Sequence, residues 1–394
     1  MTNTVTIPSN VLPEDGRFGS GPTKIRPEQI QALDKGARNL LGTSHRQTPI
    51  KQVVGSIREG LSEFFQIPDG YEVVLGNGGA SAFWDIACAS LITRKAAFGT
   101  YGSFSSKFAK SAQSAPFLEE PEIFAGEPGT YRLPELTEYV DTYCWAHNET
   151  STGVAAPIKR IAGTKEQGAL TLIDATSGAG ALPVDISQTD AYYFSPQKAF
   201  GSDGGLWIAV LSPAAIERAY GIAKSVDLPG ARRWIPPFLS LTSAIENSRK
   251  DQTLNTPAVA TLIMLENQVR WLNDNGGLAW ASARCARSAS LLYQWAEKSD
   301  YASRRKRQER ALQRRGHHRY QRWHQCIPSG GGIARKRHCG HQRLPQARPQ
   351  PAAHRRVPVR GTQRCGCAHP LYRLRGGTSL MQGKVWRYED CSDY

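Results

Sequence analysis

Acidic residues are almost missing from the C-terminal part of this sequence. Between Glu309 and Glu389 there is no aspartate or glutamate, and residues 304–394 hold 22 Lys and Arg against 4 acidic residues. Residues 1–303 hold 27 Lys and Arg against 30 acidic residues, so the net charge of +15 divides into about −3 and +18. A split of this size indicates that the two parts of the chain have different functions or different origins.

Long apolar runs and a cysteine framework are also missing. No apolar stretch approaches the roughly 20 residues that span a bilayer, and the sequence does not begin with the charged-then-apolar pattern of a secretory leader. Residues 1–303 contain three cysteines, Cys88, Cys144 and Cys285, each among apolar neighbours. These absences argue against a membrane protein and a disulfide-stabilised secreted protein, and they predict a cytoplasmic location.

Residues 1–303 show alternating strand and helix patterns. One helical pattern opens at Pro27, and a long one follows Pro257. The predicted strands are 71–75, 95–98, 139–145, 170–174, 191–194 and 206–211. This alternation predicts an α/β fold with a mostly parallel sheet that is covered on both faces.

A lysine in an apolar loop is the first candidate for chemistry. Lys198 lies in "YYFSPQKAFGSDGG", just beyond a predicted strand and before a glycine-rich turn. Apolar surroundings lower the basicity of a lysine, which a Schiff-base lysine requires. A surface lysine without a chemical role fits the same pattern, so Lys198 alone does not decide the function.

Two further motifs stand at predicted strand ends. Asp174 closes "LTLID", at the sheet edge where α/β proteins bind ligands, and could keep a pyridinium nitrogen protonated or simply cap the next helix. "GNGGAS", residues 76–81, lies between a strand and a helix, where backbone N–H groups bind phosphate. With Lys198, these motifs suggest a site for pyridoxal phosphate.

Seven motifs, in order along the chain, make the resemblance specific. They are "FGSGPTKI", "SHRQTPIK", "GNGGASAFWD", "HNETSTG", "DATSGAG", "SPQKAFGSDGGLW" and "NTPA". Together they resemble the phosphoserine aminotransferase family in its actinobacterial form, a group of class-V pyridoxal-phosphate aminotransferases. The resemblance covers roughly residues 15 to 302. It implies the aspartate-aminotransferase-like fold type I, with a lead-in at 1–15, a large cofactor-binding domain at 16–275 and the start of a small domain at 276–302.

The resemblance also implies the site residues. Lys198 matches the catalytic lysine that bonds to the cofactor, and Asp174 matches the partner of the pyridine nitrogen. His45 and Arg46 match a substrate-binding pair. The other implied cofactor contacts are Ala80, Ser81, Phe104, Thr150, Gln197, Asn255 and Thr256.

The cofactor contacts carry two further expectations. Phe104 stands where many relatives stack a tryptophan on the pyridine ring, so a thinner aromatic platform is expected. Asn255 and Thr256 match residues that reach the cofactor phosphate of a neighbouring subunit, which implies a homodimer. Neither a metal, a nucleic acid nor a membrane is implied as a partner of residues 1–302.

The implied reaction converts 3-phosphohydroxypyruvate and L-glutamate to O-phospho-L-serine and 2-oxoglutarate, in serine and also pyridoxine biosynthesis. Both substrates are polyanions, and the Arg46 guanidinium suits carboxylate or phosphate groups. A same-fold alternative is a class-V aminotransferase acting on alanine, serine or glyoxylate. A cysteine desulfurase is disfavoured because no loop of residues 1–302 offers a nucleophilic cysteine. Trp84 and Asp85 are predicted to be core and helix surface, and His147 a strand-end residue.

The basic tail, residues 303–394, has three interpretations. A nucleic-acid-binding arm would explain its charge, but the arginines are scattered and no aromatic interleaving accompanies them. A metal module would lack the C-x₂-C spacing that is usual in zinc sites. Its ligands would be Cys326, Cys339, His341, Cys365, Cys367 and His369.

The third interpretation, a shifted reading frame, explains the tail best. Residues 344–357, "LPQARPQPAAHRRV", can be encoded so that a start one nucleotide later gives YRKLGRNQLRIGV, which resembles a substrate-binding segment near the end of the family. The same offset turns residues 363–377 into SDVDALTRCIDYVV, an amphipathic helix of the type that closes the family's small domain.

The shifted frame has consequences for function. The family's arginine that binds the substrate carboxylate lies in the NQLR string, so this chain does not contain it. Residues 304–394 hold only ten Val, Ile or Leu, too few to offset the entropy of ordering, so disorder is expected. We therefore predict that the chain as written binds pyridoxal phosphate poorly or not at all and is nearly inactive.

Overall fold

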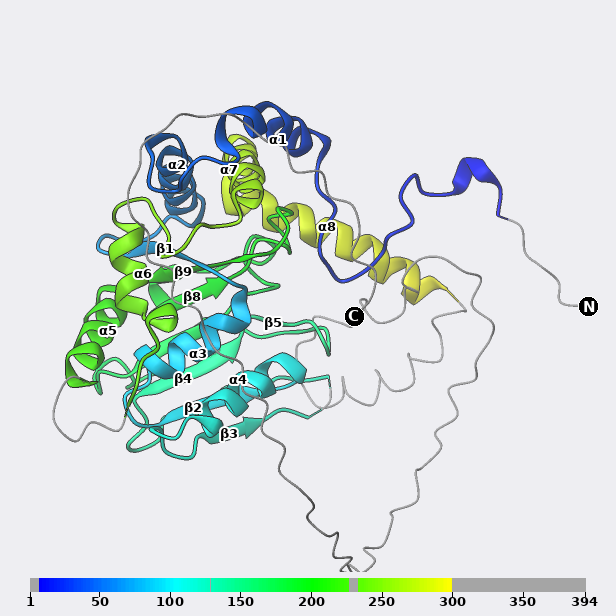
Figure 1. Ribbon diagram of the computed structural model, residues 1–394. Helices are drawn as coiled ribbons and strands as arrows, with labels where there is room; N and C mark the ends of the chain where they lie inside the picture. Colours follow the sequence, from blue (N-terminus) through cyan, green and yellow to red (C-terminus); the bar gives the residue numbers. More distant parts are fainter. Residues whose placement is uncertain (1–6, 128, 227–232, 300–394) are drawn as a thin grey trace, which may run out of the picture. The chain divides into compact units, whose positions relative to one another are not determined.

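The computed structural model describes residues 7–127, 129–226 and 233–299 (Figure 1). The chain divides into two units, Met1–Arg335 and Lys336–Tyr394, and every described residue belongs to the first. The predicted tail therefore lies outside the described residues, as do all the cysteines and histidines of the hypothetical metal module. The domain boundaries proposed from the sequence stay a prediction.

A seven-stranded sheet lies at the centre of the described part (Figure 1). Its order is β1-β9-β8-β7-β4-β2-β3, and β9 is the strand that runs antiparallel to its neighbours. The strands are β1 Glu72–Asn77, β2 Ala96–Thr100, β3 Glu122–Ala125, β4 Thr142–Ala146, β7 Leu170–Asp174, β8 Ala191–Phe194 and β9 Leu206–Leu211. A short hairpin, β5 Asn148–Glu149 with β6 Val154–Ala155, follows β4. The predicted α/β fold with a mostly parallel sheet is confirmed.

Helices cover both faces of the sheet because its strands are apolar on both sides. In β9, Leu206, Ile208 and Val210 belong to one core, and Trp207, Ala209 and Leu211 belong to the other. The first core is completed by α2 Thr48–Phe65 and α7 Val259–Asp274, on which α1 Pro27–Leu40 packs. The second core is completed by α3 Ala80–Ser90, α4 Ser103–Ser114, α5 Pro213–Val226 and α6 Leu241–Ser248. Short 3₁₀ turns occur at Ser9–Val11, Ile186–Gln188 and Pro237–Leu239.

The last described helix, α8 Gly277–Lys298, follows α7 and buries only Ala281 and Ala296 along its length. No helix among the described residues is long and apolar enough to cross a membrane. The cytoplasmic location stays a prediction.

All six predicted strands are present; those at 170–174, 191–194 and 206–211 have the predicted bounds, and the other three have shifted ends. The strand predicted at 139–145 begins only at Thr142, because Tyr139 has a φ of 62° and turns the chain. The edge strand β3 was not predicted, since it alternates half-buried and exposed residues over only four positions. Helix α4, "SFSSKFAKSAQS", was also missed, because its serines have weak helix propensity.

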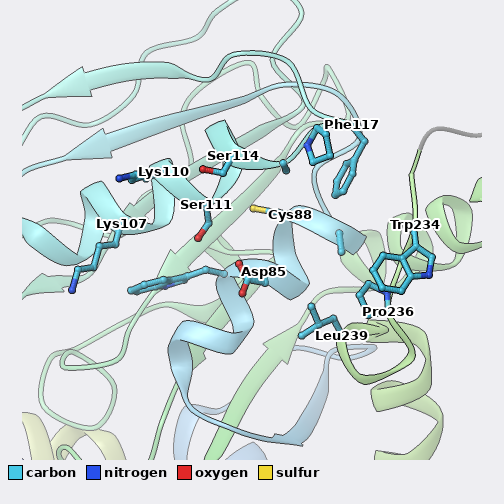
Figure 2. Close-up of a pocket in the computed structure, with 14 residues that line it drawn as sticks. Asp85, Cys88, Lys107, Lys110, Ser111, Ser114, Phe117, Trp234, Pro236 and Leu239 are labelled. Carbon is cyan, nitrogen blue, oxygen red and sulfur yellow. The ribbon is translucent and has the colours of Figure 1, made fainter. Parts of the chain in front are cut away.

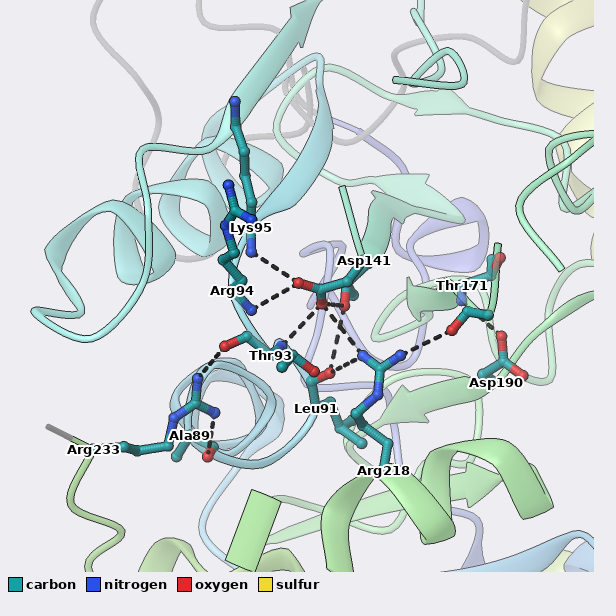
Figure 3. A network of polar contacts seen from close by, with 12 residues as sticks. Ala89, Leu91, Thr93, Arg94, Lys95, Asp141, Thr171, Asp190, Arg218 and Arg233 are labelled. Atoms are coloured by element: carbon teal, nitrogen blue, oxygen red, sulfur yellow. Dashed lines mark hydrogen bonds and ion pairs between the residues drawn. The ribbon is translucent and has the colours of Figure 1, made fainter. Parts of the chain in front are cut away.

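A half-buried carboxylate ties the start of β2 to the start of β4 (Figure 3). Asp141, just before β4, accepts hydrogen bonds from the backbone N–H groups of Thr93, Arg94 and Lys95 at 2.9, 2.7 and 2.9 Å. The guanidinium of Arg218 in α5 lies 3.3 Å from the same carboxylate. These bonds fix the amino edge of the sheet. The polar side chains at the opposite, carboxyl edge are therefore held on a rigid frame.

Candidate active site

The carboxyl edge of the sheet carries the candidate site residues. Asp174 is the last residue of β7, and Lys198 lies in the loop after β8. The "GNGGAS" turn joins β1 to α3. Because β1, β7 and β8 run in the same direction, their C-terminal ends lie at one edge, as the sequence predicted.

Lys198 is half-buried against the N-terminal segment. Its Nζ donates a hydrogen bond to the carbonyl oxygen of Ser20 at 2.8 Å, and the Thr23 N–H donates to the Gln197 carbonyl, also at 2.8 Å. Gly21 makes this approach feasible: its φ is +125°, and a Cβ there would lie 2.9 Å from the lysine Nζ. Burial lowers the pKa of Lys198 from the ordinary lysine value. This environment agrees with the sequence pattern, and the catalytic role of Lys198 stays a prediction.

Asp174 is held by three hydrogen bonds. Its Oδ1 accepts from the backbone N–H and the hydroxyl of Thr176 at 3.0 and 2.6 Å, and its Oδ2 accepts from Trp84 Nε1 at 2.8 Å. The side chain is only 6% exposed. Burial raises the pKa of Asp174, and the bonds from Thr176 and Trp84 partly offset this rise. The carboxylate is therefore oriented before any ligand binds.

The N-terminus of α3 forms a backbone cradle. The helix begins at Ala80, with Gly79 as its N-cap, and no side chain caps its first N–H groups. A Cβ on Gly79 would have nothing within 4 Å, so the approach to these groups is open. The helix dipole and the N–H groups of Ala80 and Ser81 suit an anion such as phosphate.

The two predicted pairs His45–Arg46 and Asn255–Thr256 lie close together in the structure. The Thr256 hydroxyl lies 3.2 Å from His45 Nδ1, and the Asn77 amide donates to the Thr256 carbonyl at 2.9 Å and to the Asn255 carbonyl at 3.4 Å. Thus the two predicted pairs, separated by more than 200 residues, lie beside the β1–α3 turn of their own subunit. Arg46, at the start of the segment leading into α2, is exposed.

His45 is buried, unlike its neighbour Arg46. It is 3% exposed, and its Nε2 is buried without a hydrogen-bond partner among the described residues. Burial lowers the pKa of His45, and the neighbouring Arg46 charge adds to the effect. Gln197 Oε1 is likewise buried without a partner in the described part of the chain.

Phe104 and Thr150 lie at the start of α4 and in the β5–β6 turn. The buried Glu149 carboxylate accepts from the backbone N–H groups of Phe104 and Ser105, the latter at 2.8 Å, and so fixes the first turn of α4. A Cβ on Gly102 would lie 2.3 Å from the Glu149 side chain, so only glycine fits there. Thr150 donates its hydroxyl hydrogen to Ser177 at 2.8 Å. Phe104 is 42% exposed, with the Lys107 ammonium 5.6 Å from its ring centre.

His147 is a buried strand-end residue. Its N–H donates to the Asp174 carbonyl at 2.9 Å, and its Nδ1 lies 3.0 Å from the Tyr192 hydroxyl. Burial lowers the pKa of His147 to about 4, so the imidazole is neutral at pH 7. Its side chain therefore acts as packing and hydrogen bonding under the Asp174 edge.

A cavity of about 640 Å³ lies elsewhere, between α3, α4 and residues 234–239 (Figure 2). Trp84, Asp85 and Cys88 of α3 line it, whereas neither Lys198 nor Asp174 does. Burial raises the pKa of the Cys88 thiol to about 12, so this cysteine is not a nucleophile at neutral pH. The candidate catalytic pair, Lys198 and Asp174, therefore lies outside the lining of this cavity.

The residues at the strand ends fit pyridoxal phosphate. The open α3 N-terminus suits its phosphate, and Asp174 retains an acceptor position for its ring nitrogen. The Lys198 amine has a lowered pKa and could react with its aldehyde. The unpartnered Gln197 oxygen and His45 nitrogen are further polar atoms that a polar ligand would satisfy.

Comparison with known proteins gives the class. Residues 18–313 match the family profile described as "Aminotransferase class-V". A crystal structure of a phosphoserine aminotransferase from Cytophaga hutchinsonii has the same fold, with a TM-score of 0.64 and 23% identity over 71% of this chain and 77% of that one. A pyridoxal-phosphate-bound phosphoserine aminotransferase from Trichomonas vaginalis gives a TM-score of 0.59 at 18% identity, over 72% of this chain and 78% of that one. The chain therefore belongs to the class-V aminotransferase family.

The more specific similarity is to phosphoserine aminotransferases. The enzyme of that name from Rhodococcus opacus is 55% identical over 303 residues, which are 77% of this chain and 79% of the relative. The family resemblance, the fold type and pyridoxal phosphate as the cofactor are thereby confirmed. The similarity leaves about a quarter of this chain unmatched, as expected if the tail is not family sequence.

Sequence reasoning missed two residues of this site. Trp84 was predicted to be core only, yet its indole holds Asp174; the signal was its place one turn after Ala80, on the face of α3 that meets the sheet. Glu149 received no role, although "HNET" contains it, because a buried carboxylate that caps a helix 45 residues away leaves no local pattern. The individual roles of the predicted site residues stay predictions.

Proposed function

We propose that the strand-end site catalyses pyridoxal-phosphate-dependent amino transfer from L-glutamate to 3-phosphohydroxypyruvate. The observation that carries this proposal is the half-buried Lys198 amine, with its lowered pKa, at the same sheet edge as the oriented Asp174 carboxylate. An uncharged amine is the nucleophile that this chemistry needs.

Different residues of the chain would bind the cofactor and move the proton. When bound, pyridoxal phosphate supplies an electron sink for the charge left at the substrate's Cα. Lys198 would hold the cofactor through its aldehyde carbon and would move the proton at the substrate's Cα. Asp174 would keep a proton on the ring nitrogen, and Phe104 would cover one face of the ring. The phosphate contacts fall to Ala80, Ser81 and the α3 N-terminus, with Thr150 and Gln197 as further polar contacts.

The substrate class follows from the arginine beside the site. Arg46 is exposed and follows His45, whose ring meets Thr256, and a guanidinium binds a phosphate or carboxylate bidentately. We expect a protein with the tail in the restored frame to prefer 3-phosphohydroxypyruvate over pyruvate and glyoxylate by about a hundredfold in kcat/KM, since a lost bidentate charged pair costs about 3 kcal/mol. Steady-state assays with each ketoacid and glutamate measure this ratio.

A matched variant sharpens the substrate test. Arg46→Lys keeps the positive charge but loses the bidentate hydrogen-bonding geometry of the guanidinium. The preference for the phosphorylated ketoacid should therefore shrink without disappearing. Equal activity on glyoxylate or pyruvate would instead favour an alanine-, serine- or glyoxylate-type aminotransferase of the same fold.

A homodimer is the second part of the proposal. The pairs His45–Arg46 and Asn255–Thr256 meet on one surface, and Arg46, Asn255 and Thr256 are exposed there. We infer that this surface reaches the phosphate and substrate of a second copy. Sedimentation velocity of the frame-restored protein should give a dimer, and mixing chains with Lys198→Met and Arg46→Ala should recover activity that neither has alone. A monomer with full activity would contradict this assembly.

The tail limits the chain as written. Residues 303–394 lack the family's carboxylate-binding arginine, and their sequence is not that of the domain that closes over the substrate. We therefore propose that the described part carries the residues of the cofactor site, whereas cofactor retention, substrate capture and closure are all impaired in the chain as written.

A further inference from the structure

Trp84 links the second core to the candidate site. Its indole Nε1–H donates to Asp174 Oδ2 at 2.8 Å, although the residue lies on α3 and Asp174 ends β7. The ring is 9% exposed and lies nearly parallel to Phe108 of α4, with an interplanar angle of 17° and 6.2 Å between the centroids. Packing between two helices therefore fixes the direction from which the N–H reaches the carboxylate.

The Trp84 bond limits the acceptor positions that Asp174 can offer to a ligand. An ionised carboxylate has about four lone-pair positions. Two of them, on Oδ1, are taken by the N–H and hydroxyl of Thr176, and a third, on Oδ2, is taken by Trp84. Among the described residues, no other donor makes a hydrogen bond of good geometry to Asp174, although the Tyr193 hydroxyl lies close enough for the carboxylate to raise its pKa. The remaining acceptor position is therefore on Oδ2. Asp174 is thus left able to accept one more N–H, from one direction.

We propose that Trp84 is a positioning residue that turns the Asp174 carboxylate so that its remaining Oδ2 position meets a protonated heteroaromatic ring nitrogen. The ligand class is an N-protonated pyridine, and the inference rests on the proposed function. A phenylalanine at 84 would fill most of the same space but would leave Oδ2 with two undirected positions.

The other groups near Asp174 do not replace Trp84. Tyr193 of β8 is paired with Asp174 across the sheet, and its hydroxyl is buried without a hydrogen-bond partner among the described residues. Burial raises the pKa of Tyr193, and Asp174 adds to this rise. Glu149 raises the pKa of Asp174, and His147 is neutral at pH 7. The charged form of Asp174 therefore depends on the bonds from Thr176 and Trp84.

The Trp84 bond should stabilise the folded chain more at high pH than at low pH. Burial raises the pKa of Asp174 in the folded chain above its unfolded value, so stability falls as pH rises through the folded pKa. The Trp84 bond opposes this rise, because it is stronger to a carboxylate than to a carboxylic acid. Removing the bond must therefore cost more at pH 8 than at pH 4.

The experiment compares two tryptophan-to-phenylalanine variants of the full chain. Trp84→Phe loses a bond to Asp174, and Trp145→Phe loses a bond of 3.2 Å to the neutral backbone carbonyl of Pro157; Trp145 is buried in the opposite core. In urea unfolding, Trp84→Phe should lower the folding equilibrium constant about tenfold more at pH 8 than at pH 4. Trp145→Phe should lower it equally at both pH values. Equal losses for Trp84→Phe at the two pH values would overturn the proposal.

The affinity for pyridoxal phosphate tests whether Asp174 meets the ring nitrogen. Calorimetric titration with pyridoxal phosphate, on the frame-restored protein, should show about tenfold weaker binding for Trp84→Phe and unchanged binding for Trp145→Phe. Unchanged binding for Trp84→Phe would also overturn the inference. If the wild-type protein binds no pyridoxal phosphate while Trp84→Phe still shows the pH-dependent loss of stability in urea, the proposed function is refuted. The coupling between Trp84 and Asp174 then still stands.

Discussion

Restoring the reading frame at the start of the tail is expected to raise transaminase activity about a thousandfold. The restored tail supplies the arginine of the NQLR string, and losing one partner of a buried charge pair costs about 2–5 kcal/mol, or roughly 30- to 4000-fold. It also restores an amphipathic helix in place of a segment with ten Val, Ile or Leu in 91 residues. Release of 2-oxoglutarate from glutamate and 3-phosphohydroxypyruvate measures the gain.

The matched control is a gene recoded synonymously over the same codons, which leaves this chain unchanged. It should remain nearly inactive and bind pyridoxal phosphate weakly. Resequencing across codons 295–310 should then find one inserted or deleted base. Ordinary transaminase rates from the chain as written would refute both the shifted frame and the predicted inactivity.

Replacing Lys198 by methionine is expected to abolish covalent binding of pyridoxal phosphate and to reduce transamination by about ten-thousandfold or more, because the variant lacks both the nucleophile and the proton carrier. Borohydride reduction followed by mass spectrometry detects the covalent bond, and it can be applied to the chain as written and to the frame-restored protein. Lys165→Ala, which changes an exposed lysine, should leave both unaltered.

The stability of the Lys198→Met variant separates chemistry from folding. Because burial lowers the pKa of Lys198, the folded chain releases its proton more easily than the unfolded chain does. The stability of the chain therefore falls as pH drops from the unfolded value of 10.5 through the folded pKa, and methionine removes this cost. The unfolding midpoint of Lys198→Met at pH 7 should thus be no lower than that of wild type. A large loss of stability would show that the lysine has a structural role instead.

Local patterns were sufficient to predict most of the fold. The strands at 170–174, 191–194 and 206–211 were predicted because continuous apolar runs report burial on both faces. The position of Lys198 and Asp174 at strand ends followed from the same runs. The strand order β1-β9-β8-β7-β4-β2-β3 was not predictable, since it depends on packing among segments far apart in the chain.

The sequence by itself determined the class of protein, the glycine-rich turn, the reactive lysine and the break in composition at the tail. These are local properties of residue type and order. Only the tertiary structure decided that Trp84 holds Asp174 and that His45 meets Thr256 across more than 200 residues. Such contacts arise because strand pairing and helix packing bring distant side chains to one edge, and a hydrogen bond forms wherever donor and acceptor then meet.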